Sequence, residues 1–215
     1  MRYLDIVNGV LRRLRETEVE SVNQTPYSRL IGDFVNQTKR EVEDSYNWNV
    51  LTQSLTVFTT ADLFNYVLVG SGSRFKVIDV LNLTQNIRMV NKSREYLNTL
   101  FLNGVTEKGA PCYYGWNGVD TSGDFQVDLW PSPEREYHLQ FNMVIPQNEL
   151  AEDNTRLMVP YEPVLLGAYA KAIRERGEDQ GNMGAEVQGQ YLGALASAVA
   201  QEQARYPDEA VWYPQ

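Results

Sequence analysis

The stretch FQVDLWPSPEREYHLQFNMVIP, Phe125 to Pro146, decides the fold, because it places two alternating runs directly before a long helical tail. A period of two is typical of a half-buried strand. Pro131 and Pro133 have no N–H to donate to a sheet, so PSPERE is expected to be the connection, and the stretch predicts a β-hairpin. Five apolar side chains of the second run share one predicted face: Tyr137, Leu139, Phe141, Met143 and Ile145.

The residues before this stretch also have strand character. The segments SLTVFTT, FNYVLV, FKVIDVLNL and IRMV are short, rich in β-branched and aromatic residues, and separated by clusters such as GSGS. One segment, Ser93–Phe101, lacks alternation and starts with a possible capping serine, which predicts a short helix within the strands. We therefore expect a β domain over residues 49–150.

The two ends of the chain have the helical period. A first helix is expected over Tyr3–Glu16, and a second from Pro26 to near Trp48, with Thr25 as its cap. Two more are expected after Pro146, one ending at Gly177 and one over about Met183–Arg205. The predicted organisation is 1–48 helical, 49–150 β, 151–205 helical and 206–215 an extended tail.

Composition limits the class of protein. The chain has 215 residues, 43% of them hydrophobic, which is typical of a globular protein. Its formal net charge of −9 argues against a surface that grips nucleic acid through its phosphates. A single cysteine excludes an intrachain disulfide. The N-terminus is amphipathic, unlike a signal peptide, and no stretch is long and apolar enough to predict a membrane span.

Residues suited to catalysis are few. His138 lies in the middle of a predicted strand, and Cys112 lies beside YYGW without a base that would activate it. The motif GSGSR, Gly70 to Arg74, lacks the spacing of a phosphate loop and is interpreted as a turn. We expect no catalytic residue, cofactor or metal site. Five carboxylates could be proposed as the paired acids of a glycosidase, but we interpret them as solvated turn residues: Asp120, Asp124, Asp128, Glu134 and Glu136.

Two large rings stand near the C-terminus. Trp212 and Tyr213 lie between Pro207 and Pro214 in a segment that cannot continue a helix. Rings on an extended segment form an exposed apolar patch unless they dock. The hypothesis is that both bind a partner, either a neighbouring copy or another protein, with docking on their own domain as the alternative.

The order of these parts resembles the head-to-tail adaptor proteins of tailed bacteriophages, the group that includes tail tubular A proteins and the head-completion adaptors of short-tailed phages. The resemblance rests on KGAPCYYGW, the stretch LWPSPEREYHLQFNMVIPQNEL, the acidic link ELAEDN, and MVPYEPVLLGAYAKAIRERGED. It covers most of the chain. Each motif is only moderately specific, and their sequence order carries the comparison.

The resemblance implies an α+β fold, in which the N- and C-terminal helices form a bundle with an inserted antiparallel β barrel or sandwich. It also implies a structural virion protein at the head-tail interface, made in the host cytoplasm. Its partners would be further copies in a dodecameric ring, the portal protein, and tail nozzle or tail fibre proteins. Genomic DNA would pass through the ring without sequence-specific binding, and no membrane or enzyme activity is implied.

Charge predicts which surface faces that DNA. Residues 151–215 contain ten acidic and five basic side chains, and carboxylates repel phosphates over about 8 Å at physiological salt. Arg174 and Arg176 would offset part of this negative charge. The alternative interpretation is that all of these residues are ordinary solvated helix charges. The candidate channel-facing residues are Glu175, Glu178, Asp179, Glu186 and Glu202.

Two other functions remain open at this stage. A carbohydrate-binding or depolymerising tail module would use an aromatic cluster as a sugar platform, although packing in a core or ring interface is the favoured interpretation of that cluster. A different neck or baseplate ring protein would have the same general composition. The cluster consists of Tyr113, Tyr114, Trp116 and Trp130.

Overall fold

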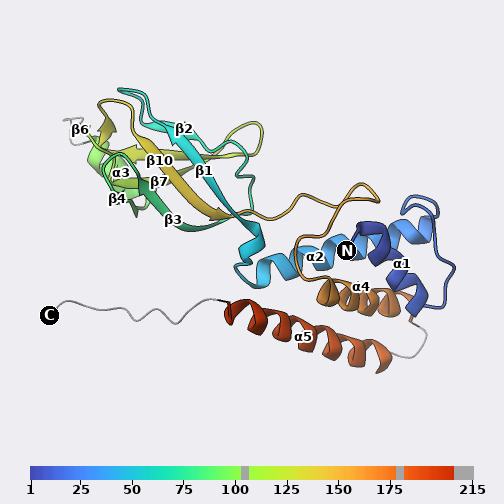
Figure 1. Ribbon diagram of the computed structural model, residues 1–215. Coiled ribbons are helices and arrows are strands. Elements are labelled where there is room, and N and C mark those ends of the chain that lie inside the picture. Colours follow the sequence, from blue (N-terminus) through green and yellow to red (C-terminus); the bar gives the residue numbers. More distant parts are fainter. Residues whose placement is uncertain (103–106, 178–181, 206–215) are drawn as a thin grey trace. The chain divides into compact units, whose positions relative to one another are not determined.

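The computed structural model describes residues 1–102, 107–177 and 182–205, and it shows an α+β chain (Figure 1), which confirms the predicted class. The chain divides into two compact units. The helical unit consists of Met1–Val50 and the chain from Gln147 onward, and the β unit is Leu51–Pro146. In the ranges described, no helix has the length and apolar character needed to span a bilayer.

Local signals set the helix ends of the helical unit. Thr25 caps α2, its hydroxyl accepting from the Ser28 N–H at 3.0 Å, with Pro26 in the first turn as predicted. Gly177, at φ 66°, ends α4 in the left-handed conformation. Helix α2 ends three residues before Trp48, whose indole N–H donates back to the carbonyl of Val42 at 2.6 Å. The helices are α1 (Tyr3–Arg13), α2 (Pro26–Ser45), α4 (Tyr161–Arg176) and α5 (Asn182–Gln203).

Helix α4 is the central helix of this unit. It contacts α1, α2 and α5, and Figure 1 shows α4 between α2 and α5. Gly167 lies where α4 contacts α2 and α5. A Cβ atom at this position would stand 2.4 Å from Cγ2 of Thr38 on α2 and 3.1 Å from the ring of Tyr191 on α5. The missing side chain therefore permits the close approach of α2 and α5 to α4.

A buried ion pair holds the point where the chain re-enters the helical unit. Lys39 and Glu43, one turn apart on α2, lie 2.9 Å from each other with side chains 1% and 0% exposed. The Lys39 ammonium donates to the carbonyl of Gln147 at 2.6 Å, and Glu43 accepts from the Gln147 N–H at 3.2 Å. Both backbone groups of Gln147 are thus bound by α2.

The strands of the β unit form two four-stranded sheets and one two-stranded sheet. The first has the order β1 (Thr52–Phe58), β10 (His138–Val144), β3 (Lys76–Asn82), β4 (Ile87–Arg88). The second has the order β2 (Asn65–Val67), β8 (Phe125–Trp130), β7 (Tyr113–Val119), β5 (Val90–Asn91). The third pairs β6 (Lys108–Gly109) with β9 (Ser132–Pro133), and two short helical segments, η1 (Asn49–Leu51) and α3 (Arg94–Leu102), complete the elements.

The hairpin prediction is wrong, because the two alternating runs belong to different sheets. Strand β8 pairs with β2 and β7, whereas β10 pairs with β1 and β3. The PSPERE connection carries the chain from one sheet to the other, and it is held on the way by β6 and by Thr59. The Thr59 hydroxyl donates to the carbonyl of Arg135 and accepts from the N–H of Tyr137, and the Thr59 N–H donates to the Tyr137 carbonyl.

The predicted apolar face of β10 is confirmed, and it lies between the two large sheets. Its five residues, from Tyr137 to Ile145, are all buried in one core with Val127 and Leu129 of β8 and Val80 of β3. The described strands form open sheets, so the barrel alternative is not found. The first sheet is antiparallel throughout, the second is mixed because β5 pairs with β7 in parallel, and β6 pairs with β9 in parallel.

We predict that Gly167→Ala lowers the free energy of unfolding by about 1–3 kcal/mol, because the added methyl overpacks the junction of three helices. The matched control is Gly189→Ala on α5, where a Cβ atom meets nothing within 4 Å. The control should stabilise the protein by about 0.5–1 kcal/mol, because alanine favours a helix over glycine. Urea unfolding of both variants measures the difference, and equal effects would contradict the packing argument.

We predict that Lys39→Met lowers the free energy of unfolding by about 3–5 kcal/mol, since it leaves the Glu43 carboxylate buried without its cation. Lys171→Met is the control, because Lys171 pairs with the half-exposed Glu41 at 2.5 Å, and its loss should cost less than about 1 kcal/mol. Chemical denaturation at neutral pH gives both values. A loss below about 1 kcal/mol for Lys39→Met would show that the buried pair does not stabilise the unit.

Candidate assembly surface

The helical unit carries an open groove of about 790 Å³, whose wall comes from four parts of the sequence. These are the first residue, the end of the segment after α2, the link before α4, and the last turn of α5. The floor of the groove is buried and is formed by Trp48, Leu157 and Val159. The exposed rim, here called the apolar rim, consists of Met1, Val50, Met158 and Tyr161, each between 39% and 51% exposed.

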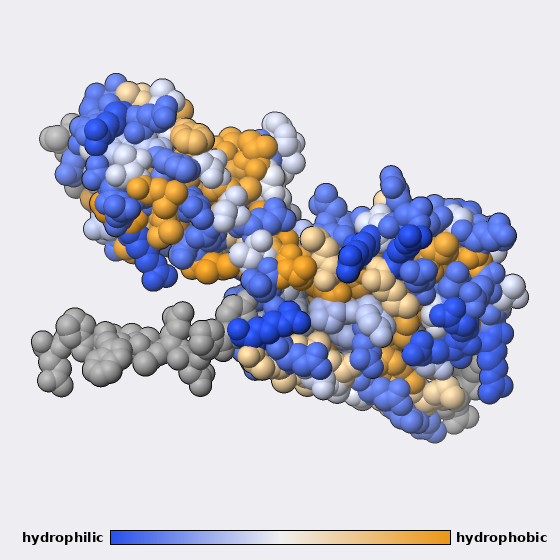
Figure 2. Space-filling view, in the orientation of Figure 1, coloured by the Kyte–Doolittle hydropathy of each residue, from blue (hydrophilic) through white to orange (hydrophobic). Residues whose placement is uncertain are grey.

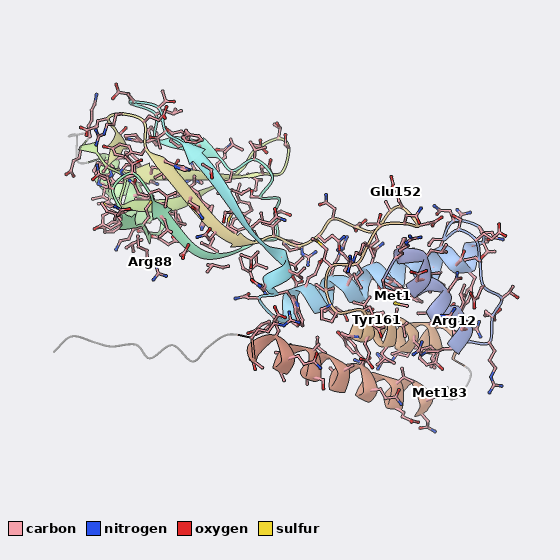
Figure 3. All side chains as sticks on the ribbon, viewed as in Figure 1. Met1, Arg12, Arg88, Glu152, Tyr161 and Met183 are labelled. Carbon is pink, nitrogen blue, oxygen red and sulfur yellow. The ribbon has the colours of Figure 1, made fainter. Side chains whose placement is uncertain are left out.

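Backbone pairing fixes the wall of the groove. The link Thr155–Tyr161 runs beside the start of the chain, where the Tyr3 N–H donates to Thr155 and the Leu157 N–H donates to Met1, at 2.9 and 3.0 Å. The side chain of Gln147 holds the other edge of the link, donating to the carbonyl of Arg156 at 2.8 Å and accepting from the N–H of Met158 at 3.2 Å. Figure 3 shows Met1 and Tyr161 close together on this unit, in agreement with their shared place in the rim.

Exposed apolar side chains in one groove mark a surface that is suited to binding another chain. Figure 2 shows apolar surface between hydrophilic side chains on the visible face of the helical unit. A volume of about 790 Å³ lies within the range of about 300–1,000 Å³ seen for ligand pockets. The groove is considered as a docking surface because of its exposed apolar rim. The described residues contain no group of three or more metal-ligating side chains.

Glu202 closes one end of this groove and is 5% exposed. One carboxylate oxygen accepts from the N–H of Asn49 at 3.0 Å, and the other pairs with the guanidinium of Arg205 at 2.7 Å. Its charge therefore acts within the helical unit, joining the end of α5 to the segment after α2. The expectation that Glu202 offers an exposed carboxylate to DNA does not agree with this burial.

Two of the other predicted acidic residues lie on helices, Glu175 on α4 and Glu186 on α5. Glu175 and Glu186 are exposed, and Glu186 accepts a long hydrogen bond of 3.5 Å from Gln190. Glu178 and Asp179 lie outside the described residues, as do Trp212 and Tyr213 of the tail. Arg176 is engaged within the unit, with its guanidinium bonded to Glu16 and to the hydroxyl of Tyr27 at 2.7 Å. Arg174 is exposed.

Helix α5 buries few side chains for its length. Val187 and Tyr191 are buried, whereas Leu192 is 54% exposed. Burial, followed by the charge of Glu41, raises the pKa of Tyr191 to about 12, and its hydroxyl lies 3.4 Å from a carboxylate oxygen of Glu41. Tyr191 therefore anchors the inner face of α5, and the outer face keeps apolar residues in contact with solvent.

Three aspartates of the β unit serve its loops. Asp124 accepts from the N–H groups of Gly70 and Gly72, at 3.1 and 3.0 Å, and both glycines have positive φ, which confirms the interpretation of GSGSR as a turn. Asp120 accepts from the N–H groups of Ser122 and Asp124. Asp128 accepts from the side chains of Asn65 and Asn117. These contacts give each carboxylate a structural role.

The histidine and the cysteine also have surroundings that suit packing. The His138 ring stacks on Phe58 with centroids 4.8 Å apart. Burial, and then the charge of Glu107, raises the pKa of the Cys112 thiol. A raised pKa reduces the fraction of thiolate, whereas a nucleophilic cysteine needs it lowered. The two residues lie on different elements and support no shared mechanism.

The aromatic cluster packs largely within the β unit, as the favoured interpretation predicted. Tyr114 and Trp130 are buried, and their rings meet Phe141 and Phe101 edge to face. Trp116 packs on two phenylalanine rings at the margin of the core. Tyr113 is half-buried, with the Lys92 ammonium 5.2 Å from its ring centroid. This burial argues against a flat sugar platform.

The groove was missed by the sequence analysis. Its residues come from segments that are far apart in the chain and have no common period. The one available signal was the run LMVPY, in which apolar side chains fall in an irregular link that would ordinarily be polar. Apolar residues without a period point to a buried link or to an exposed contact surface, and this link provides both.

The model of the family described as SU10 adaptor protein matches residues 1–212, nearly the whole chain. Among curated proteins, none matches this sequence.

Proposed function

The chain belongs to the SU10 adaptor protein family, and from this premise we propose that it forms a ring between the portal and the tail of a phage particle. Membership supports a structural role as a phage head-to-tail adaptor and a place in the virion. The match over residues 1–212 carries the proposal, because it includes both the helical unit and the β unit.

In the proposed assembly, twelve copies form the ring and continue the DNA channel from the portal toward the tail nozzle or tail fibres. The tail tubular A proteins are the adaptors to which we compare its role. The terminal helices would act as one bundle that makes the contacts between copies and with the portal. The observation that supports this assignment is the apolar rim on the helical unit, which has no covering segment among the described residues.

Ring formation is proposed to need a template. The groove is a small surface, and a contact of this size holds two free subunits weakly. A portal that already positions neighbouring copies raises their effective concentration, and the same weak contacts then become sufficient. The isolated protein is therefore expected to be monomeric and the portal-bound protein to be a ring.

The proposed channel wall includes the exposed carboxylates Glu175 and Glu186. DNA must slide past this wall, and strongly held phosphates would slow it. Carboxylates keep the phosphates away over about 8 Å at physiological salt. We also propose that the tail with Trp212 and Tyr213 docks outside its own helical unit, as a partner-binding segment.

We predict that the purified protein alone has the mass of a monomer and that, mixed with the portal of the same phage, it gives a complex with a ring of added subunits. Native mass spectrometry of the two samples tests this. A protein that forms no ring and joins no portal complex would contradict the adaptor role in this form. A ring that forms only with another neck or baseplate protein would move the assignment to that part of the virion.

We predict that the double variant Glu175→Lys and Glu186→Lys still assembles into particles but releases DNA more slowly, because the lysines attract phosphates in the channel. Glu152→Lys is the control, as Glu152 is an exposed residue of the link before α4. The rate of DNA release from purified particles, measured at two salt concentrations, gives the effect. A rate equal to that of the control, or a virion map with the β unit at the channel wall, would contradict the charge argument.

A further inference from the structure

The apolar rim exposes side chains that a bound segment would cover. Four side chains from separated segments, Met1, Val50, Met158 and Tyr161, surround the groove in the monomer with 39% to 51% of each exposed. The backbone bonds of the link Thr155–Tyr161 hold them in place. A preformed apolar groove of this kind binds a segment with large apolar side chains more tightly than a polar one.

The C-terminal segment of the chain has the matching composition. The ten residues after Arg205, YPDEAVWYPQ, contain Val211, Trp212 and Tyr213 close together. Trp and Tyr are the residues most often found as anchors in interface pockets. The two methionines of the rim are suited to such rings, because a flexible thioether adapts its shape and makes favourable contacts with aromatic groups.

Charge is complementary as well. Arg156 lines the groove with an exposed guanidinium that makes no ion pair within residues 1–102, 107–177 and 182–205. The C-terminal segment has Asp208 four residues and Glu209 three residues before Trp212. An extended chain places such residues within about 14 Å of each other, so one segment can reach the rim with its rings and Arg156 with its acids.

The place where this segment begins decides which copy receives it. Arg205, its last described neighbour, itself lines the groove. Pro207 biases Tyr206 toward an extended conformation, so the sequence directs the segment away from the helix end. Trp212 follows Arg205 by seven residues, which reach about 25 Å when extended. This reach is long enough for the rings to enter the groove of a neighbouring copy.

We propose that the groove of each copy binds Val211–Pro214 of a neighbouring copy, with Asp208 and Glu209 beside Arg156. This inference rests on the ring proposed above and supplies its contact between subunits. The donor segment and the acceptor groove are different surfaces, so the contact is head-to-tail, and a repeated head-to-tail contact closes into a ring when its rotation permits.

A peptide with the sequence YPDEAVWYPQ tests the groove directly. The receptor is the full chain with Trp212→Ala and Tyr213→Ala, which keeps the groove and removes the competing rings. Saturable binding with one peptide per chain is expected by calorimetry, and a peptide with both rings replaced by alanine should bind about 30-fold more weakly or worse. No binding to this receptor, or binding only to purified portal, would overturn the proposal.

Rim variants of the same receptor locate the site. Met158→Glu should weaken binding at least about tenfold, because it places a charge in the apolar rim next to an acidic ligand. Arg156→Glu should weaken it as well, and more at low salt. Val69→Glu is the control, since Val69 is an exposed apolar residue of the β unit and should leave affinity unchanged. Equal affinities for all variants would place the peptide elsewhere and overturn the proposal.

Cysteine cross-linking identifies the donor copy. The full chain with Cys112→Ser, Val50→Cys and Val211→Cys is oxidised in portal-bound rings, or in rings that the protein forms alone. A ladder of linked subunits in a denaturing gel is the expected result. An internal link without a ladder means that each segment occupies its own groove, and this overturns the proposal. Rings that form without any cross-link overturn the proposed contact, while the proposed adaptor function stands. If no rings form, the result contradicts the proposed adaptor function, and the peptide experiment alone decides whether the groove binds the C-terminal segment.

Discussion

The buried Lys39–Glu43 pair is the interaction on which the helical unit depends. Removing two charges from water costs several kcal/mol for each ion, so such a pair stabilises only when its remaining hydrogen-bonding groups are also satisfied. Gln147 supplies a donor and an acceptor from its backbone. Its side chain then holds the link before α4 at Arg156 and Met158. The link that carries Met158 of the apolar rim is therefore positioned, through one residue, by a charge pair in the C-terminal half of α2.

The acidic residues of this chain show how a structural phage adaptor uses its charges. Glu202 holds the end of α5 to Asn49, and Asp124 holds a glycine turn of the β unit. Each carboxylate replaces water by backbone N–H groups, which satisfies loop and terminal donors that would otherwise be unpaired. The negative charge is thus partly structural, and its exposed members, such as Glu175 and Glu186, are the ones available for the proposed long-range repulsion of DNA.

Sequence patterns predicted the local structure better than the long-range pairing. Thr25, Pro26 and Gly177 act through their own backbone neighbours, so their signals were sufficient to place the ends of α2 and α4. The alternation of β10 correctly predicted its buried face. It contained no information on partners, because strands β8 and β10 alternate in the same way and yet join different sheets. The groove was hidden for the same reason, since its wall is assembled from segments up to two hundred residues apart.

A weak contact has an advantage for a protein that must assemble at one place and time. If the groove bound its occupant tightly, free copies would associate in solution and form rings or open chains away from the portal. A rim that is only half-exposed and a segment of only four residues both limit the affinity of a single contact. In the proposed ring, closure multiplies such contacts, and every copy gives one segment and receives one. The stability of this proposed assembly would thus depend on the number of contacts rather than on the strength of any one of them.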